Sequence, residues 1–195
     1  MIYKRYIMAP KVKITKDDII NTAVEIVRKN GAEAINARNV AAALGCSTQP
    51  VFSNFSSMDE LKLAVIHKAD GLCQKYIRNE CEKGEYTSYK ASGMAYIRFA
   101  KEEKELFKLL YMRDRSKESG ADSADSPLFD SMVSMVQGNT GLEDRDASLF
   151  HFEMWAVVHG IATMLATGFL ELDFELISKI LTDSYLGMRK QYGME

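Results

Sequence analysis

Residues 37–55 read ARNVAAALGCSTQPVFSNF, and this stretch decides the fold of the amino-terminal part of the chain. Its first half is a short run of small residues around Val40 that favours a helix and ends at Gly45, where the backbone can turn sharply. Pro50 falls in the first turn of the second half, where a missing backbone N–H costs little. The stretch therefore predicts two short helices, 37–44 and 48–54, separated by a tight three-residue turn that Ser47 ends as the cap of the second helix.

The side chains of this helix pair divide into an inner and an outer set. We expect Val51 and Phe55 to turn inward and to fix the second helix against the first. Two short helices joined by such a turn form a helix-turn-helix unit, whose second helix enters the major groove of DNA. There, Gln can pair with adenine and Thr can offer a hydroxyl or a methyl group. The expected DNA contacts are Arg38, Ser47, Thr48, Gln49, Pro50, Phe52, Ser53 and Asn54.

Helix signals continue on both sides of this unit. Thr15 followed by Asp18 resembles a capping box, Asn30-Gly31 ends that helix with Gly31 in a left-handed position, and Asn36 and Ser57 are further caps. The helix after Ser57 is expected to reach about Cys81, and later helices are predicted at 87–102, 104–112, 127–137, 144–167 and 173–191. The prediction is an all-α protein of about nine helices. It has a flexible basic leader (1–14), a three-helix DNA-binding domain (15–60) and a larger helical domain for ligand binding and dimerisation (61–195).

Charge is distributed unevenly along the 195 residues. Residues 1–56 hold eight Lys and Arg against four Asp and Glu, whereas the remainder holds 17 against 23. A basic end on an acidic body suits a small module that faces phosphates. The leader lysines and arginines at 4, 5, 11 and 13 fit either a DNA-contacting arm or a disordered tail.

Other classes of protein find little support in the sequence. No stretch approaches the roughly 20 apolar residues of a membrane span, and the opening residues lack the apolar region of a signal peptide, so a cytoplasmic protein without membrane contact is expected. The three cysteines lack metal-ligand spacing, and Cys73 and Cys81 on one helix would lie about 12 Å apart, too far for a disulfide. No metal, cofactor or nucleophile–base arrangement is predicted, which argues against an enzyme.

The combined spacing of these features resembles the amino-terminal domain of the tetracycline-repressor (TetR) family over residues 15–64. The residues that carry the resemblance are Thr15, Ile19, Ala23, Gly31, Arg38, Val40, Ala41, Leu44-Gly45-Cys46-Ser47, Phe52, Phe55 and Asp59-Glu60-Leu61. The later segments 96–98, 105–107 and 155–160 resemble a regulatory domain common in that family. The resemblance implies a dimeric DNA-binding regulator with a small-molecule effector.

Two positions depart from the family pattern. Phe52 stands where the family usually has Tyr, and Met58 stands where it often has Lys, and both usual residues contact phosphate. Their loss removes two polar groups that position the protein on the DNA backbone. We therefore expect DNA binding to depend on Arg38, Ser47, Thr48 and helix amides, and its salt dependence to be weaker than in relatives that keep both groups.

Two sites are expected in the second domain. Aromatic and methionine side chains could line an effector pocket or simply form core, and the candidates are Phe99, Phe107, Tyr111, Met132, Phe152, Trp155 and His159. A stripe of small residues on the 144–167 helix and a seam-like repeat on the last helix favour a dimer interface, although both stripes could pack inside one subunit. Its candidates are Ala156, Gly160, Thr163, Ile177, Leu181, Ser184 and Met188.

The function predicted from these features is a homodimeric, sequence-specific DNA-binding repressor that an effector in the second domain releases. One alternative is a protein-binding helical module with a weakened DNA head, because Phe52 and Met58 lack phosphate-gripping groups. A second alternative, an enzyme using the helical pocket, lacks any acid–base or nucleophile constellation.

Overall fold

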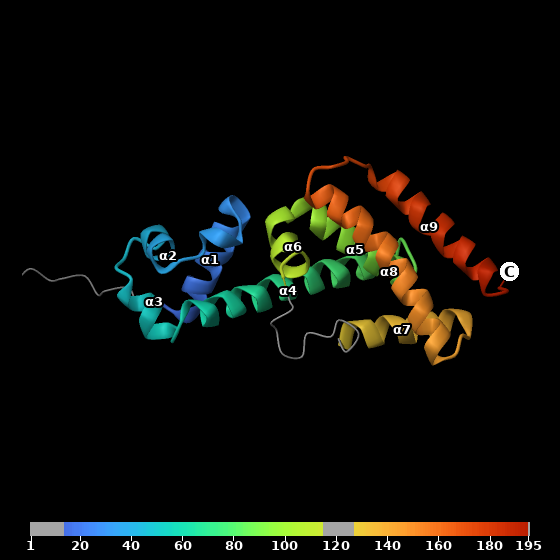
Figure 1. The fold of residues 1–195 in the computed structure, drawn as a ribbon, viewed down its shortest axis with the longest axis horizontal. Helices are drawn as coiled ribbons and strands as arrows, with labels where there is room; N and C mark the ends of the chain where they lie inside the picture. The colour runs from blue at the N-terminus through green and yellow to red at the C-terminus, as the bar shows by residue number, and fades with distance from the viewer. Residues whose placement is uncertain (1–13, 115–126, 195) are drawn as a thin grey trace, which may run out of the picture.

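The computed structural model describes residues 14–114 and 127–194, so all but the last residue of the expected leader (1–14) and all but the first residue of the loop at 114–126 lie outside the described residues. Within these two ranges the chain forms nine α-helices and one 3₁₀ turn, Ala32–Ala34 (Figure 1). The helices are α1 (Lys16–Asn30), α2 (Ala37–Ala43), α3 (Gln49–Asn54), α4 (Met58–Lys83), α5 (Ser88–Glu102), α6 (Lys104–Tyr111), α7 (Pro127–Thr140), α8 (Asp144–Ala166) and α9 (Phe174–Gln191). The predicted all-α fold is confirmed.

The predicted amino-terminal caps are present in three helices. Thr15 accepts a hydrogen bond from the Asp18 N–H at 3.1 Å, and the Asp18 carboxylate accepts one from the Thr15 N–H at 2.9 Å, which completes a capping box. Asn36 Oδ1 accepts from the Asn39 N–H at 2.9 Å, and Ser57 Oγ accepts from the Glu60 N–H at 3.1 Å. These local bonds explain why α1, α2 and α4 begin where the sequence predicted.

Two local predictions about backbone positions were wrong in detail. Gly31 has a positive φ of 79°, but its ψ of 169° is extended rather than left-handed helical, a region that glycine adopts readily. Thr48, not Ser47, precedes α3, and its backbone is already helical, so its side chain makes no capping hydrogen bond.

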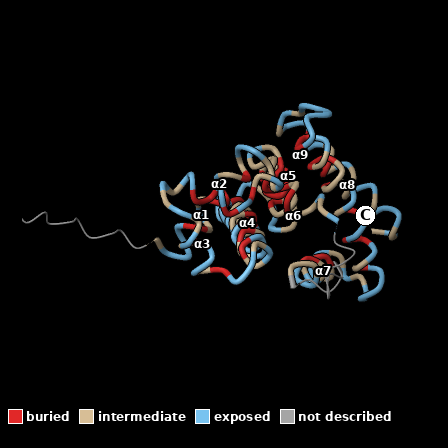
Figure 2. The backbone as a smooth tube through the Cα atoms, turned by 60° about the vertical axis from the view of Figure 1, so that its left-hand side comes forward, coloured by how far each residue is buried: buried red, intermediate tan, exposed pale blue. Residues whose placement is uncertain are grey.

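Most of the buried hydrophobic residues belong to one continuous core. Figure 2 marks the buried positions in red along the backbone. It begins with Ile19 in α1 and continues through Leu61 in α4 and Phe107 in α6 to Leu181 in α9. A separate small cluster, centred on Val136 and Phe150, packs α7 against the start of α8. The first three helices and the larger domain therefore share a core, while α7 is held mainly by the second cluster.

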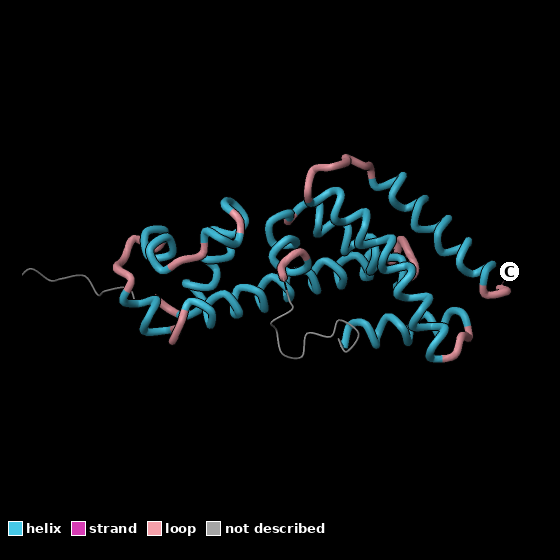
Figure 3. The backbone as a smooth tube through the Cα atoms, in the orientation of Figure 1, coloured by secondary structure: helices cyan, strands magenta, loops and turns pink. Residues whose placement is uncertain are grey.

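Helix α4 connects the two ends of the molecule (Figures 1 and 3). It starts beside α1 and α3 and runs under α6 and α5, and it has no break over its 26 residues. Backbone hydrogen bonds link each turn of a helix to the next, so an unbroken helix moves as one unit. The α1–α3 end is thus carried on a rigid element of the larger domain.

Helix α8 is long and apolar enough to cross a membrane, judged by length and composition alone. The sequence prediction that no stretch comes near a membrane span was therefore too strong. In the structure α8 packs against α5, α7 and α9 and buries nine residues, among them Phe150, Ile161 and Leu165. Its apolar composition is that of a core helix of this domain.

Candidate DNA-binding surface

Helices α2 and α3 form the helix-turn-helix unit that the sequence predicts, with bounds shifted by one residue. Gly45 has a φ of +65°, and its N–H donates to Ala42 O at 3.1 Å, while the Cys46 N–H donates to Ala41 O at 3.0 Å. These bonds satisfy the last carbonyls of α2 and reverse the chain direction. Val51 and Phe55 are buried as expected and fix α3 on the core.

The outward residues of this unit are all at least partly exposed. Arg38, Ser47, Gln49, Phe52 and Ser53 are exposed, and Thr48, Pro50 and Asn54 are half-buried. The sequence-predicted DNA-contact residues therefore all reach the surface of α2, α3 or the turn between them.

Two of these polar side chains also bond their own helix. Ser53 Oγ donates to Gln49 O at 2.9 Å, and Asn54 Nδ2 donates to Pro50 O at 2.8 Å. These bonds occupy the Ser53 hydroxyl hydrogen and one of the two Asn54 amide hydrogens, so both side chains have fewer donors left for bases. Gln49, Thr48 and Arg38 are accordingly the polar residues best placed to meet DNA.

The two departures from the family pattern have different structural settings. Phe52 is 57% exposed, a large apolar ring on the outer face of α3. Met58 is half-buried and packs against the main core at the start of α4. Met58 thus contributes packing where a lysine would contribute charge. The Phe52 ring, by contrast, is mostly exposed and contributes less packing than Met58.

The structure adds one residue that the sequence analysis missed, Lys16 at the start of α1. Its Nζ lies 3.0 Å from Glu60 Oε1 on α4 and 4.6 Å from the centre of the Phe55 ring. Hydrogen bonds from the Ser56 backbone and from Lys16 lower the pKa of Glu60 to about 2. These contacts tie the beginnings of α1 and α4 together, and no local signal in the sequence predicts them because Lys16 and Glu60 are 44 positions apart.

A second group of interest is a cluster of aromatic rings between α5, α6 and α8. Tyr96 and His159 share a hydrogen bond of 2.9 Å, and Trp155 stacks on His159 with ring centres 4.8 Å apart. Phe107 and Tyr111 of α6 pack on Tyr96 at 5.4 and 4.9 Å. We call these five residues the ring cluster.

Burial sets the protonation states around the ring cluster. It lowers the pKa of His159, which favours the neutral imidazole, and raises the pKa of Tyr111 well above its ordinary value. Tyr111 donates to Cys73 Sγ at 3.5 Å, and burial raises the pKa of that thiol to about 11. The cluster is therefore neutral near pH 7. Its hydroxyl and imidazole groups lie among aromatic faces, and the Cys73 thiol lies beside it.

The predicted pocket residues do not form one site. Phe107, Tyr111, Trp155 and His159 belong to the ring cluster, and Phe152 lies beside Trp155 at 5.9 Å but is 54% exposed. Phe99 packs instead on Tyr76 of α4, and Met132 Sδ accepts a hydrogen bond from Ser92. Tyr96 and Cys73 were missed, because only the folded chain brings α4, α5 and α8 together.

The predicted dimer residues also divide. Ala156, Gly160 and Thr163 lie on an α8 face that has the exposed apolar residues Leu149, Phe152 and Met164. By contrast, Ile177 and Leu181 are buried in their own subunit's core, and Met188 packs in the second cluster. Ser184 is half-buried. The seam-like repeat of α9 is thus an internal stripe, and the exposed apolar residues of that helix are Leu176 and Leu186.

In the part of the chain that the structure describes, no group of three or more His, Cys, Asp or Glu side chains could hold a metal ion. The three cysteines are free thiols.

Comparisons with known proteins agree on one family. Residues 89–183 match the family model described as "Tetracyclin repressor-like, C-terminal domain". A comparison with curated proteins gives no match. The fold is similar to that of a TetR-like transcriptional regulator from Rhodococcus sp. RHA1, with 16% identity, a TM-score of 0.68, and coverage of 95% of this chain and 100% of that one.

A TetR-family member from Streptomyces coelicolor A3 is also similar, with 17% identity, a TM-score of 0.58, and coverage of 87% of this chain and 96% of that one. The family's C-terminal domain and the shared helical fold point to the same class, a class of regulators rather than of enzymes. Residues 89–183 are thus a tetracycline-repressor-like C-terminal domain, and the chain has the fold of TetR-like transcriptional regulators.

Proposed function

We propose that the protein is a homodimeric repressor that reads its operator with α3 and leaves the DNA when a small molecule binds in the larger domain. The observation that carries the DNA-binding part is the outer surface of the helix-turn-helix unit. Gln49 and Phe52 are exposed on α3 while Val51 and Phe55 of the same stretch are buried. A short helix anchored on one side and polar on the other is what groove reading requires.

The DNA-binding and regulatory parts of the chain meet at the predicted boundary, residue 60. We treat 15–60 as the reading head and 61–195 as the regulatory domain. Helix α4 crosses this boundary within its first turn, and the main core includes residues from both sides. A displacement in the regulatory domain can therefore reach the head without passing through a flexible linker.

The proposed dimer interface is the exposed apolar face of α8 with the outer face of α9. At 100° per residue, Leu149, Phe152, Ala156, Gly160 and Met164 fall within one half of the α8 surface. Exposed apolar residues that share a face mark a contact surface more often than isolated ones do. Two-fold pairing would place two reading heads about 34 Å apart, or a multiple of it, to match successive turns of DNA.

The proposed effector site is the ring cluster. Its neutral aromatic faces, with hydroxyl and imidazole groups between them, suit an uncharged aromatic or planar ligand better than an ion. Binding would favour a dimer with differently spaced heads, so the effector must bind that state more tightly than the DNA-bound state.

Selection of bound sequences from a random DNA pool tests the function. We expect one palindromic sequence to be enriched and bound in a salt-dependent manner. An exposed Phe52 without a phosphate-gripping hydroxyl also fits a protein-binding module. Failure to enrich any sequence even at low salt would favour that second candidate.

A further inference from the structure

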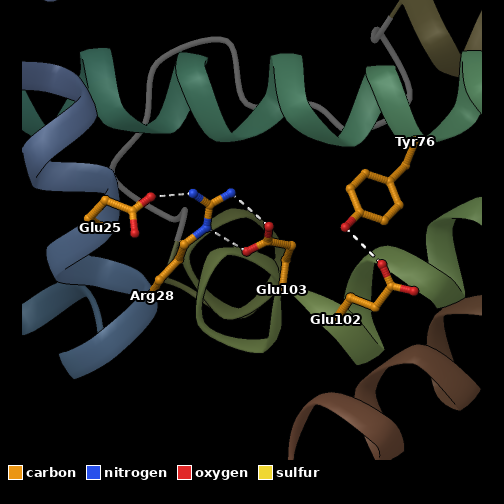
Figure 4. A network of polar contacts seen from close by, with 5 residues as sticks. All are labelled: Glu25, Arg28, Tyr76, Glu102 and Glu103. Atoms are coloured by element: carbon orange, nitrogen blue, oxygen red, sulfur yellow. Dashed lines mark hydrogen bonds and ion pairs between the residues drawn. The ribbon is translucent and has the colours of Figure 1, made fainter.

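Arg28, near the end of α1, binds Glu103 at the corner between α5 and α6 (Figure 4). Its Nε donates to Glu103 Oε2 at 2.8 Å and its Nη2 donates to Glu103 Oε1 at 2.7 Å. Glu25, one turn earlier on α1, holds the remaining Nη1. The guanidinium is therefore fixed between two carboxylates. It makes its bidentate contact with Glu103 of the regulatory domain.

Glu103 stands where α5 ends and α6 begins. Its N–H donates to Phe99 O and its carbonyl accepts from the Phe107 N–H, both at 2.8 Å. The preceding residue, Glu102, accepts a hydrogen bond from the Tyr76 hydroxyl of α4 at 2.9 Å. Two consecutive glutamates thus bind the same corner to two different helices, α4 through Glu102 and α1 through Glu103 (Figure 4).

This ion pair is partly shielded from water and joins distant parts of the sequence. The side chains of Arg28 and Glu103 are 32% and 16% exposed, and the two residues are 75 positions apart in sequence. Partial exclusion of water strengthens the pair, and the planar fork fixes the angle as well as the distance between the two helices. The hydrogen bonds that Arg28 donates to the Glu103 carboxylate raise the pKa of Arg28 above its ordinary value.

Polar groups surround this contact. An open cleft of about 770 Å³ lies beside it, lined by residues 28–31 at the end of α1 and by residues 101–105 at the corner. The cleft walls are mostly charged side chains, so apolar packing does not hold the head in place there. The Arg28–Glu103 fork bridges the two walls.

Helix α6 also extends from this corner to the ring cluster. Glu103, Phe107 and Tyr111 are spaced i, i+4 and i+8, which places them on one side of α6. We propose that Arg28 and Glu103 are positioning residues, which hold the reading head at a fixed angle on the α5–α6 corner and so set the separation of the two heads in the dimer. This inference rests on the proposed DNA-binding function.

The test measures how sharply the protein distinguishes operator spacings. The operator selected from the random pool is remade with its two half-sites moved apart or together in single base-pair steps. Dissociation constants are then measured for each spacing and for an isolated half-site. The variants are Glu103→Gln, Arg28→Gln and both together, with Glu105→Gln as the matched control, because Glu105 also lines the cleft but pairs with Lys108 of its own helix.

We expect Glu103→Gln to reduce the preference for the best spacing by about tenfold, since a charge-assisted bond contributes about one such factor. Binding to the isolated half-site should stay unchanged, because the α3 surface is intact; a merely structural defect would weaken both. The double variant should be no worse than either single variant, since all three break the same contact. Glu105→Gln should retain the wild-type preference.

Three results separate the possible failures. If the wild-type protein binds no DNA sequence specifically, the proposed function falls. If it does bind and Glu103→Gln keeps the wild-type spacing preference, the positioning role is wrong and the proposed function stands. Equal loss at the half-site and at the full operator, or additive effects of the two single variants, would also contradict the positioning role.

Discussion

The Tyr89 hydroxyl and His151 Nδ1 lie 3.0 Å apart and join α5 to α8 by a hydrogen bond. The histidine is 7% exposed, and the Phe129 ring of α7 packs edge-on against it with centres 4.8 Å apart. Loss of water around the imidazole lowers the pKa of His151 from about 6.5 to about 4. The neutral ring is therefore part of the seam between α5, α7 and α8.

This setting predicts a loss of stability in mild acid. Because the pKa of His151 is lower in the folded state, stability is fully present above about pH 6.5 and is lost as the pH falls toward 4. A shift of this size corresponds to about 3 kcal/mol. Denaturant unfolding at several pH values should show His151→Gln less stable at pH 7.5 but less sensitive to acid. The control is His67→Gln. His67 is an exposed residue of α4, and this variant should retain the wild-type pH dependence of stability.

The salt dependence of DNA binding should respond to Phe52. Phe52→Tyr adds a hydroxyl to an exposed ring of α3. If that hydroxyl reaches a phosphate, it should tighten operator binding severalfold, and Phe52→Lys should steepen the slope of log K against log salt by about 1. Fluorescence anisotropy over a range of salt concentrations measures both. Phe52→Leu, which adds no polar group, should leave the slope unchanged, and an equal response of all three variants would contradict a phosphate contact.

Asn36 caps a helix and Ser47 does not, so their removal should affect stability differently. Asn36→Ala removes the acceptor of the Asn39 N–H and should lower the free energy of unfolding by about 1 kcal/mol. Ser47 is exposed and caps no helix, so Ser47→Ala should change stability by less than about 0.5 kcal/mol. Thermal or urea unfolding compares the two variants. A loss for Ser47→Ala as large as that for Asn36→Ala would contradict the assigned start of α3.

The dimer proposal is tested by a matched pair of exposed apolar residues. Phe152 on α8 and Leu63 on α4 are 54% and 52% exposed. A carboxylate at position 152 would have to be desolvated in the proposed interface, so Phe152→Glu should shift the protein toward monomer, whereas Leu63→Glu should not. Analytical ultracentrifugation over a concentration series gives the dissociation constants. A dimer equally stable in both variants would place the interface elsewhere.

Local signals in the sequence were sufficient for most helix boundaries. Thr15, Asn36 and Ser57 act within three residues of themselves, so their caps could be predicted without knowledge of the fold. Ser47 was misassigned because serine and threonine are both good caps and only the backbone angles of Thr48 decide between them. Local chemistry is thus read reliably from sequence except where neighbouring residues compete for one role.

Long-range relationships were predicted less well. The periodicity of the sequence identified Ile177 and Leu181 as an apolar stripe, but it could not show whether the same subunit or a partner subunit covers that stripe. Both residues are buried in the single subunit, so the stripe belongs to the subunit's own core. Phe99 and His159 were grouped by chemistry, although they face different helices. The Arg28–Glu103 fork has no sequence signature at all, since its partners are 75 residues apart.

The most direct test of the account is a titration of the selected operator, and of single-base variants of it, with the Arg38→Ala and Gln49→Ala proteins. Arg38→Ala should weaken binding to all sequences alike, because a phosphate contact carries no sequence information. Gln49→Ala should change the preference at one base pair by about 1–3 kcal/mol. If both variants bind the operator and its variants as the wild type does, the assignment of α2 and α3 as the DNA-reading surface is contradicted.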